Sequence, residues 1–194
     1  MYEMEMSEGK DLCAFCRIPP AYSNENEIKR LHKLMDKGNA GAFATLAGCY
    51  VFGTHGLMQD QQKANELYLK AGELGWAEGY YNLGNGYREG RGTEVDMKKA
   101  KYYFELAAMG GSIIGRHNLG CIEGQAGNYH RAYKHFILAA RAGYEKSLDT
   151  VKQGFEHRIV TKDEYANTLR AYQKIQDGMK SDARDKAKKM GYGN

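Results

Sequence analysis

Two neighbouring stretches decide the fold. The first reads Gly79-Tyr80-Tyr81-Asn82-Leu83-Gly84-Asn85-Gly86-Tyr87, and the second reads Lys99-Ala100-Lys101-Tyr102-Tyr103-Phe104-Glu105-Leu106-Ala107-Ala108. In the second stretch Ala100, Tyr103, Phe104 and Ala107 recur with the i, i+3, i+4, i+7 spacing of one face of an α-helix. A glycine-bearing segment with Gly90 and Gly92 separates the two stretches. The pattern predicts two helices joined by a loop.

The same pair recurs along the chain. Leucines that anchor the first helix lie 37 and 36 residues apart, and Val151 takes this place 32 residues later; alanines of the second helix lie 36 and 32 residues apart. A glycine follows each of three second helices and suits a left-handed cap, which carries a steric penalty for other residues. The repeated positions are Leu46, Leu83 and Leu119, then Ala64, Ala100 and Ala132, then Gly75, Gly111 and Gly143, with Gly38 closing an earlier incomplete unit.

The repeat unit is about 36 residues long, and the third copy is shorter because its loop is reduced to residues 124–128. A helix pair of this size cannot bury its apolar face alone, whereas stacked pairs share one continuous core. The sequence therefore predicts an all-α protein, a right-handed α-solenoid of stacked antiparallel helix pairs.

These motifs resemble the Sel-one-like repeat, a relative of the tetratricopeptide repeat. The family pattern is approximately Ala-x-x-x-Leu-Gly-x-x-Tyr, a Gly-x-Gly loop, and then Ala-x-x-Trp/Tyr-Tyr/Phe-x-x-Ala-Ala. The second copy matches it best, through Leu83-Gly84, Gly90-Arg91-Gly92 and Tyr103-Phe104. The resemblance covers residues 27–175. It implies a non-catalytic protein-interaction scaffold or adaptor that binds a partner peptide or helix on a concave face lined by first helices.

Segments at both ends flank the repeats. Residues 176–194 are expected to form a capping helix and basic tail, as part of a helix from about Lys162 to Lys189. Thr161-Lys162-Asp163-Glu164 has the capping-box pattern that opens such a helix. The cations clustered at its end indicate a solvated helix terminus rather than a nucleic-acid site. Residues 1–26 are expected to form a poorly ordered N-terminal segment.

Cys13 and Cys16 form a Cys-x-x-Cys pair that looks like the closing knuckle of a RING finger. Zinc needs four ligands, and this stretch supplies two, so a complete metal site within it is excluded. The chain is similar to protist and algal repeat proteins in which a RING-type zinc finger precedes the repeats. The alternative function is therefore the substrate-binding arm of a RING-type ubiquitin ligase whose zinc finger is truncated here. Zinc shared with another chain and a redox pair stay open.

The best candidates for partner contact are first-helix positions that vary between copies. Phe43, Tyr80 and Arg116 occupy one equivalent position, and Asn85 and Arg88 lie one and two turns further on. Aromatic residues and arginine dominate interface hot spots. Tyrosines at repeated positions, such as Tyr87 and Tyr103, are interpreted as packing residues. Asn82 and Asn118, which precede the anchor leucines, are interpreted as structural residues that bond to neighbouring backbone.

Composition narrows the class of protein. Charged residues make up 27% of the chain, hydrophobic residues 42%, and the net charge is +4, as expected for a folded domain rather than a disordered segment. Residues 1–10 lack the apolar core of a secretory signal, and no apolar run approaches about 20 residues, so neither a signal peptide nor a transmembrane helix is expected. Cys49 and Cys121 stand in apolar helical contexts and are interpreted as core residues. We expect a monomer in the cytoplasm or nucleus with a protein or peptide partner, without nucleic acid, membrane, cofactor or catalysis.

Overall fold

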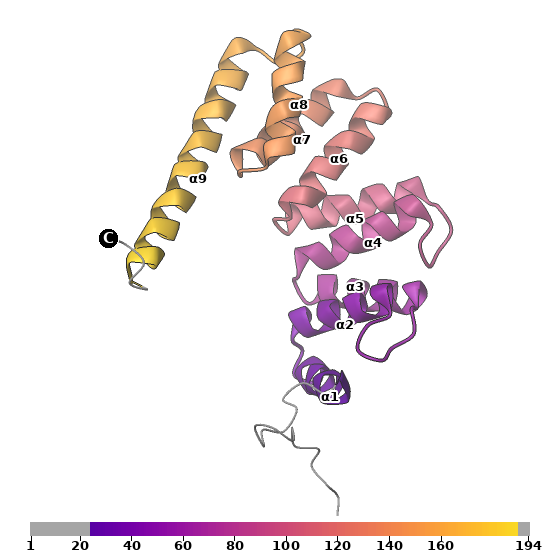
Figure 1. Ribbon diagram of the computed structural model, residues 1–194. Coiled ribbons are helices and arrows are strands. Elements are labelled where there is room, and N and C mark those ends of the chain that lie inside the picture. The colour runs from indigo at the N-terminus through magenta and orange to yellow at the C-terminus, as the bar shows by residue number, and fades with distance from the viewer. Residues whose placement is uncertain (1–23, 190–194) are drawn as a thin grey trace, which may run out of the picture.

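The computed structural model describes residues 24–189, with side chains described as far as Ser181 (Figure 1). Every regular element in this part of the chain is an α-helix. The seven helices that lie between the first and the last are each 12 or 13 residues long. The helices are α1 (Asn24–Met35), α2 (Ala40–Phe52), α3 (Gln61–Glu73), α4 (Ala77–Glu89), α5 (Met97–Met109), α6 (Ile113–Gln125), α7 (Tyr129–Arg141), α8 (Glu145–Glu156) and α9 (Lys162–Lys189).

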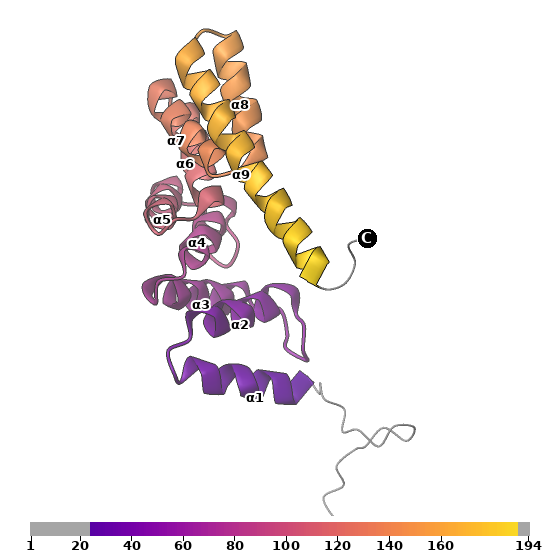
Figure 2. The ribbon, with the colours of Figure 1, turned by 90° about the vertical axis from the view of Figure 1, so that its left-hand side faces the viewer.

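The helices stack in antiparallel pairs, which confirms the predicted solenoid. Helices α2 and α3, α4 and α5, and α6 and α7 form three full repeats, each packed on the next. Helix α1 packs on α2 as the second helix of the incomplete first unit. Figure 2 shows α2 and α4 on one side of the stack and α3 and α5 on the other. The first and second helices therefore form separate faces.

The repeated anchor positions form the core. Leu46 is 2% exposed, Leu83 3% and Leu119 4%, while Val151 in α8 is fully buried. The alanines Ala64 and Ala100 are also fully buried, which lets paired helices approach closely. Gly84 lies so near Phe104 that a Cβ at residue 84 would be 2.8 Å from the ring. The small residues of the first helix thus make room for the large ring of the second.

The links between successive repeats are uniform. Residues 74–76, 110–112 and 142–144 each join a second helix to the next first helix, and the middle residue is always glycine. Gly75, Gly111 and Gly143 have φ values of 92°, 96° and 96°, which confirms the predicted left-handed glycines. By contrast, the loops within repeats differ, running over residues 53–60, 90–96 and 126–128.

Helix α9 differs from the repeat helices. It runs for 28 residues from Lys162, and the capping box forms as predicted: the Glu164 N–H donates to Thr161 Oγ1 at 3.2 Å, and the Thr161 N–H donates to Glu164 Oε2 at 2.9 Å. Its contacts are with α7 and α8, where Thr168 is fully buried. Beyond these contacts the helix runs back along the stack and diverges from it, on the side where α2 and α4 lie (Figure 2). No helix of the described residues is long and apolar enough to span a bilayer.

Candidate functional site

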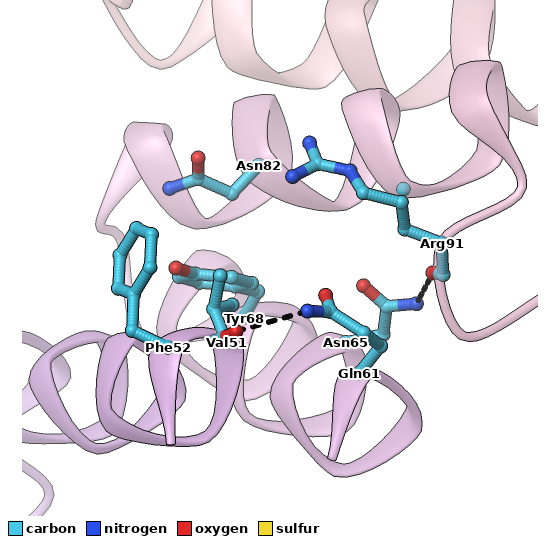
Figure 3. Close-up of a pocket in the computed structure, with 8 residues that line it drawn as sticks. Val51, Phe52, Gln61, Asn65, Tyr68, Asn82 and Arg91 are labelled. Atoms are coloured by element: carbon cyan, nitrogen blue, oxygen red, sulfur yellow. Dashed lines mark hydrogen bonds between the residues drawn. The ribbon is translucent and has the colours of Figure 1, made fainter. Parts of the chain in front are cut away.

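A polar cleft of about 210 Å³ lies between the first repeat and helix α4 (Figure 3). We call it the amide cleft because side-chain amides from two helices line it. Figure 3 shows Asn82 and Arg91 along one side and Tyr68, Gln61 and Asn65 along the other. The lining residues are Val51 and Phe52 at the end of α2, Gln61, Asn65 and Tyr68 in α3, Asn82 and Gly86 in α4, and Arg91 in the following loop.

Backbone contacts fix the position of two amides. Gln61 Nε2 donates to the Val51 carbonyl at 3.1 Å, and Asn65 Nδ2 donates to the Arg91 carbonyl at 2.7 Å. Gly86 makes the second contact possible, because a Cβ there would lie 2.8 Å from Asn65 Oδ1. The amides therefore join the end of α2 to α3 and α3 to the loop of the next repeat.

The amide cleft offers both donors and acceptors. Because Gln61 and Asn65 use their amide nitrogens within the fold, their oxygens stay available as acceptors. The amide of Asn82 makes no hydrogen bond to any described residue. Burial raises the pKa of Tyr68, so its hydroxyl stays protonated and can donate. Phe52, 76% exposed, adds an apolar surface at the edge. These groups suit binding to a peptide backbone, which presents N–H and C=O groups alternately.

The candidate row Phe43, Tyr80 and Arg116 faces a different part of the molecule from the one predicted. The Tyr80 ring packs on Gly72 of α3 and stacks on Tyr103 of α5, with centroids 6.1 Å apart. Arg116 donates to the Ala108 carbonyl at the end of α5 at 2.6 Å. This position therefore faces the second helices and does not line a groove of first helices. Phe43 is half-buried. Whether the three residues contact a partner stays a prediction.

The two other candidates are partly or fully occupied within the fold. Asn85 is only 5% exposed, and its Oδ1 lies 3.5 Å from Asn118 Nδ2 at the contact between α4 and α6. It offers a partner almost no surface. Arg88 pairs with Glu89 at 2.6 Å and lies 5.8 Å from the centre of the Phe104 ring. The packing interpretation is confirmed for Tyr87 and Tyr103, whose rings stack 5.5 Å apart.

Sequence reasoning missed the amide cleft. It treated Asn82 as a residue that bonds to backbone, whereas Asn82 lines the cleft and makes no such bond among the described residues. Asn118 contacts the Asn85 side chain instead of backbone. The available signal was the recurrence of asparagine before two anchor leucines, together with Asn65 in the following helix.

Two of the four cysteines lie within the described residues. Cys13 and Cys16 lie outside the described residues, as does the RING-like stretch around them. Cys49 is 4% exposed and packs with Leu46, as predicted for a core residue. Cys121 is half-buried, and burial raises the pKa of its thiol, which disfavours the reactive thiolate. Within residues 24–181, no group of three or more His, Cys, Asp or Glu side chains could hold a metal ion.

The stacked pairs, the uniform glycine links and the polar cleft between neighbouring repeats define a helical-repeat protein of the solenoid class. The chain belongs to the Sel1 repeat family, whose model matches residues 46–76, 77–112 and 115–144. The anchor residues Leu46, Leu83 and Leu119 each fall within one of these matches. Sel1-repeat proteins are generally protein-interaction scaffolds and generally non-catalytic.

Known proteins share the repeats over different lengths. The chain is 36% identical over 138 residues to a putative sel1-like repeat-containing protein of Acanthamoeba polyphaga mimivirus; the match covers 69% of this chain and 20% of the viral protein. It thus spans about a fifth of that relative. A Sel1 repeat protein from Oxalobacter formigenes has a similar fold, with a TM-score of 0.67 and 22% identity over 78% of this chain and 64% of that protein.

A second solved structure shares this fold. It is a protective antigen, present in uropathogenic Escherichia coli strains, that displays an SLR fold. The TM-score is 0.65 and the sequence identity 25%, over 78% of this chain and 33% of the antigen. These likenesses support the helical-repeat assignment.

Proposed function

We propose that this chain is a non-catalytic scaffold that holds an extended segment of a partner protein in the amide cleft. The observation that carries the proposal is the set of amides from α3 and α4 around one cleft, with the Asn82 amide unbonded to any described residue. An extended segment would donate to the Gln61 and Asn65 oxygens and bond to the Asn82 amide. Backbone contacts of this kind bind many sequences, and a pocket for a side chain adds selectivity.

Phe52 supplies the selective element. Its ring is 76% exposed at the edge of the amide cleft, and aromatic residues are enriched at protein interfaces. An apolar side chain of the bound segment would cover this ring. Arg91, on the other side, pairs through Nε with Glu89 at 3.0 Å, so its positive charge is already partly balanced. We therefore expect a segment with an apolar residue and little dependence on charge.

Selection from a random peptide-display library tests this function. Peptides that bind the wild-type chain should lose affinity by at least about tenfold for Phe52→Ser/Asn82→Leu, because the ring contact and the amide bonds are removed together. The matched control is Tyr129→Ser, which changes an aromatic residue that is 58% exposed on α7, away from the cleft. Circular dichroism of each variant checks that the helices are retained.

The outcomes separate the possible locations. Equal binding to the wild type, the double variant and the control would place the peptide elsewhere and contradict the amide-cleft proposal. Loss of binding in the control alone would assign the contact to α7.

A further inference from the structure

Three aromatic positions of the second repeat hold polar residues in the third repeat. In the second repeat Tyr80, Tyr87 and Tyr103 form an aromatic stack, with centroid separations of 6.1 and 5.5 Å around Tyr103. The equivalent positions in the third repeat lie 36, 36 and 32 residues later and hold Arg116, Glu123 and His135. Three packing residues are thus replaced by two charged residues and an imidazole in the same fold.

Another cleft, of about 320 Å³, lies at these replaced positions between α5, α6 and α7. We call it the arginine cleft. The amide cleft is lined by α2, α3, α4 and the loop after α4, so the two sites share no lining residue and are separate. Its main lining residues are Glu105 and Met109 in α5, Arg116 and Leu119 in α6, and Arg131 and His135 in α7.

Glu123, which also lines the cleft, is already satisfied. It is 3% exposed, and its carboxylate accepts from Lys101 Nζ and from Asn128 Nδ2, each at 2.8 Å. Its charge therefore does not neutralise the arginines. Polar groups removed from water need such partners, because an unpaired one destabilises the fold.

The remaining donors are not satisfied in the same way. Arg116 has one hydrogen bond, to the Ala108 carbonyl, although a guanidinium carries five donors. Arg131 has no carboxylate within ion-pair distance among the described residues. His135 Nδ1 is buried without a hydrogen-bond partner in this part of the chain. Two guanidinium groups with unused donors thus line the same cleft as an imidazole whose Nδ1 has no partner among the described residues.

The charges around the cleft match a single negative group. Arg116, Arg131 and Lys101 face Glu105 and Glu123, which leaves a net charge of +1 while His135 is neutral. A monoanion would balance this charge, whereas a dianionic phosphate would exceed it. Met109, 82% exposed, adds apolar surface that can cover a short aliphatic chain. Arginine binds carboxylates well because two parallel N–H groups match the two oxygens.

We propose that the arginine cleft binds a carboxylate group of a protein partner, carried on an aspartate or glutamate side chain or at a chain terminus. The carboxylate lies between Arg116 and Arg131, and its aliphatic stem contacts Met109. This site does not rest on the amide cleft, and either can be tested without the other.

His135 gives the proposal a titration signature. Burial and the neighbouring Arg116 lower the pKa of His135, while Glu123 and Glu105 act in the opposite direction and Arg131 adds to the lowering. A bound carboxylate favours the protonated imidazole and raises this pKa. By linkage, binding takes up a proton, so affinity increases as the pH falls through the titration of His135.

The test uses the full chain and two short peptides. Acetyl-Gly-Gly-Leu-Glu-Gly-amide, which carries a single carboxylate, is the probe, and the same peptide with glutamine in place of glutamate is its neutral control. Nuclear magnetic resonance of histidine-labelled protein follows the ring of His135, with His135→Tyr used to assign its signal. We expect the glutamate peptide to shift this signal and raise the pKa of His135, and the glutamine peptide to do neither.

Variants localise the contact. Fluorescence anisotropy with the labelled glutamate peptide should give a dissociation constant raised at least about tenfold by Arg131→Gln and further by Arg116→Gln/Arg131→Gln. Lys99→Gln is the matched control, because Lys99 is the equivalent of Arg131 in the second repeat and lies 5.1 Å from the Tyr87 ring centre. It should leave binding unchanged. Arg131 is exposed, so its single variant stays informative even where the double variant fails to fold.

Several results would overturn the proposal. These are no binding of the glutamate peptide at millimolar concentrations, equal binding of the glutamine peptide, or equal affinity of Arg131→Gln and the wild type. Inorganic phosphate provides a last comparison. Phosphate that shifts the His135 signal while the glutamate peptide does not would contradict the carboxylate assignment.

Discussion

Glu123 of α6 is joined to Lys101 of α5 by an ion pair of 2.8 Å, although Glu123 is only 3% exposed. The side chain of Lys101 is 34% exposed, so one partner reaches solvent and the other does not. The hydrogen bond from Lys101, with that from Asn128, holds the pKa of Glu123 below its ordinary value of 4.5 against the effect of burial. A carboxyl with a lowered pKa stabilises the fold while it is ionised.

This pair predicts a pH-dependent part of the stability. Because the pKa of Glu123 is lower in the folded chain, its stabilising effect is complete above about pH 4.5 and is lost as the pH falls through the folded value. Urea unfolding should show that the wild type loses more free energy of unfolding than Glu123→Gln between neutral pH and about pH 3. Parallel losses in the two proteins would contradict this account.

The same pair predicts an asymmetry between its members. Lys101→Met leaves a buried carboxylate without its cation and should lower the free energy of unfolding by about 2–4 kcal/mol at neutral pH. Glu123→Gln leaves a partly exposed ammonium that water can solvate, so the loss should be smaller, about 1–2 kcal/mol. Urea unfolding of both variants checks the order, and a larger loss in Glu123→Gln would contradict it.

Two helical glycines should respond in opposite directions to alanine. A Cβ at Gly79 would lie 2.5 Å from the Tyr68 carbonyl oxygen and 2.7 Å from the Gly72 nitrogen, and backbone atoms cannot rotate away. Gly79→Ala should therefore lower the free energy of unfolding by about 2 kcal/mol or more. A Cβ at Gly48 would meet no atom within 4 Å, so Gly48→Ala should raise it by about 0.5–1 kcal/mol. Thermal unfolding compares the pair; destabilisation of both would show that the α3–α4 contact has no special role.

The capping box of α9 gives a local prediction. Thr161 Oγ1 accepts from the Glu164 N–H at 3.2 Å and donates to Glu164 Oε2 at 2.8 Å. Thr161→Ala removes both bonds and should destabilise the start of α9 by about 1 kcal/mol. Hydrogen exchange should show faster exchange in the first turn of α9 and no change in α4. The double variant Thr161→Ala/Glu164→Gln should be destabilised by less than the sum of the two single variants, because each single change already disrupts the same capping box.

Ser147 and His117 join the third repeat to α8. Ser147 is fully buried, and its Oγ lies 2.8 Å from His117 Nδ1. Ser147→Ala deletes the partner of a half-buried imidazole and should lower the free energy of unfolding by about 1–2 kcal/mol. Thr150→Ala is the control. It removes an exposed hydrogen bond from Thr150 Oγ1 to the Lys146 carbonyl and should lower the free energy of unfolding by less. Equal losses in the two variants, measured by urea unfolding, would contradict a special role for Ser147.

The repeat period predicted the parts of the structure that follow from periodicity. Leu46, Leu83, Leu119 and Val151 are all buried because residues one repeat apart occupy equivalent environments in a stack. The left-handed glycines could be predicted for the same reason. A fixed period identifies equivalent residues even where sequence similarity is weak, as at Val151.

The candidate site could not be predicted in the same way. The repeat period predicts that Tyr80 and Arg116 occupy equivalent positions. It does not predict which neighbours that position faces, because this depends on how the second helices pack. Asn85 is buried because α4 and α6 approach each other, and such contacts between alternate helices depend on the curvature of the stack. The amide cleft also forms only because the loop after α4 reaches α3, where the Arg91 carbonyl accepts a hydrogen bond from Asn65. The repeat period does not predict this contact.

The uniform links between repeats have a mechanical consequence. Each successive pair is attached through three residues centred on a left-handed glycine, so the joints of the array are alike. A load applied along the stack would therefore meet a link of the same length and backbone conformation at each of these three joints. The loops within repeats vary in length without altering these joints. An array built in this way can gain new surface chemistry in one repeat while the links between its repeats stay the same.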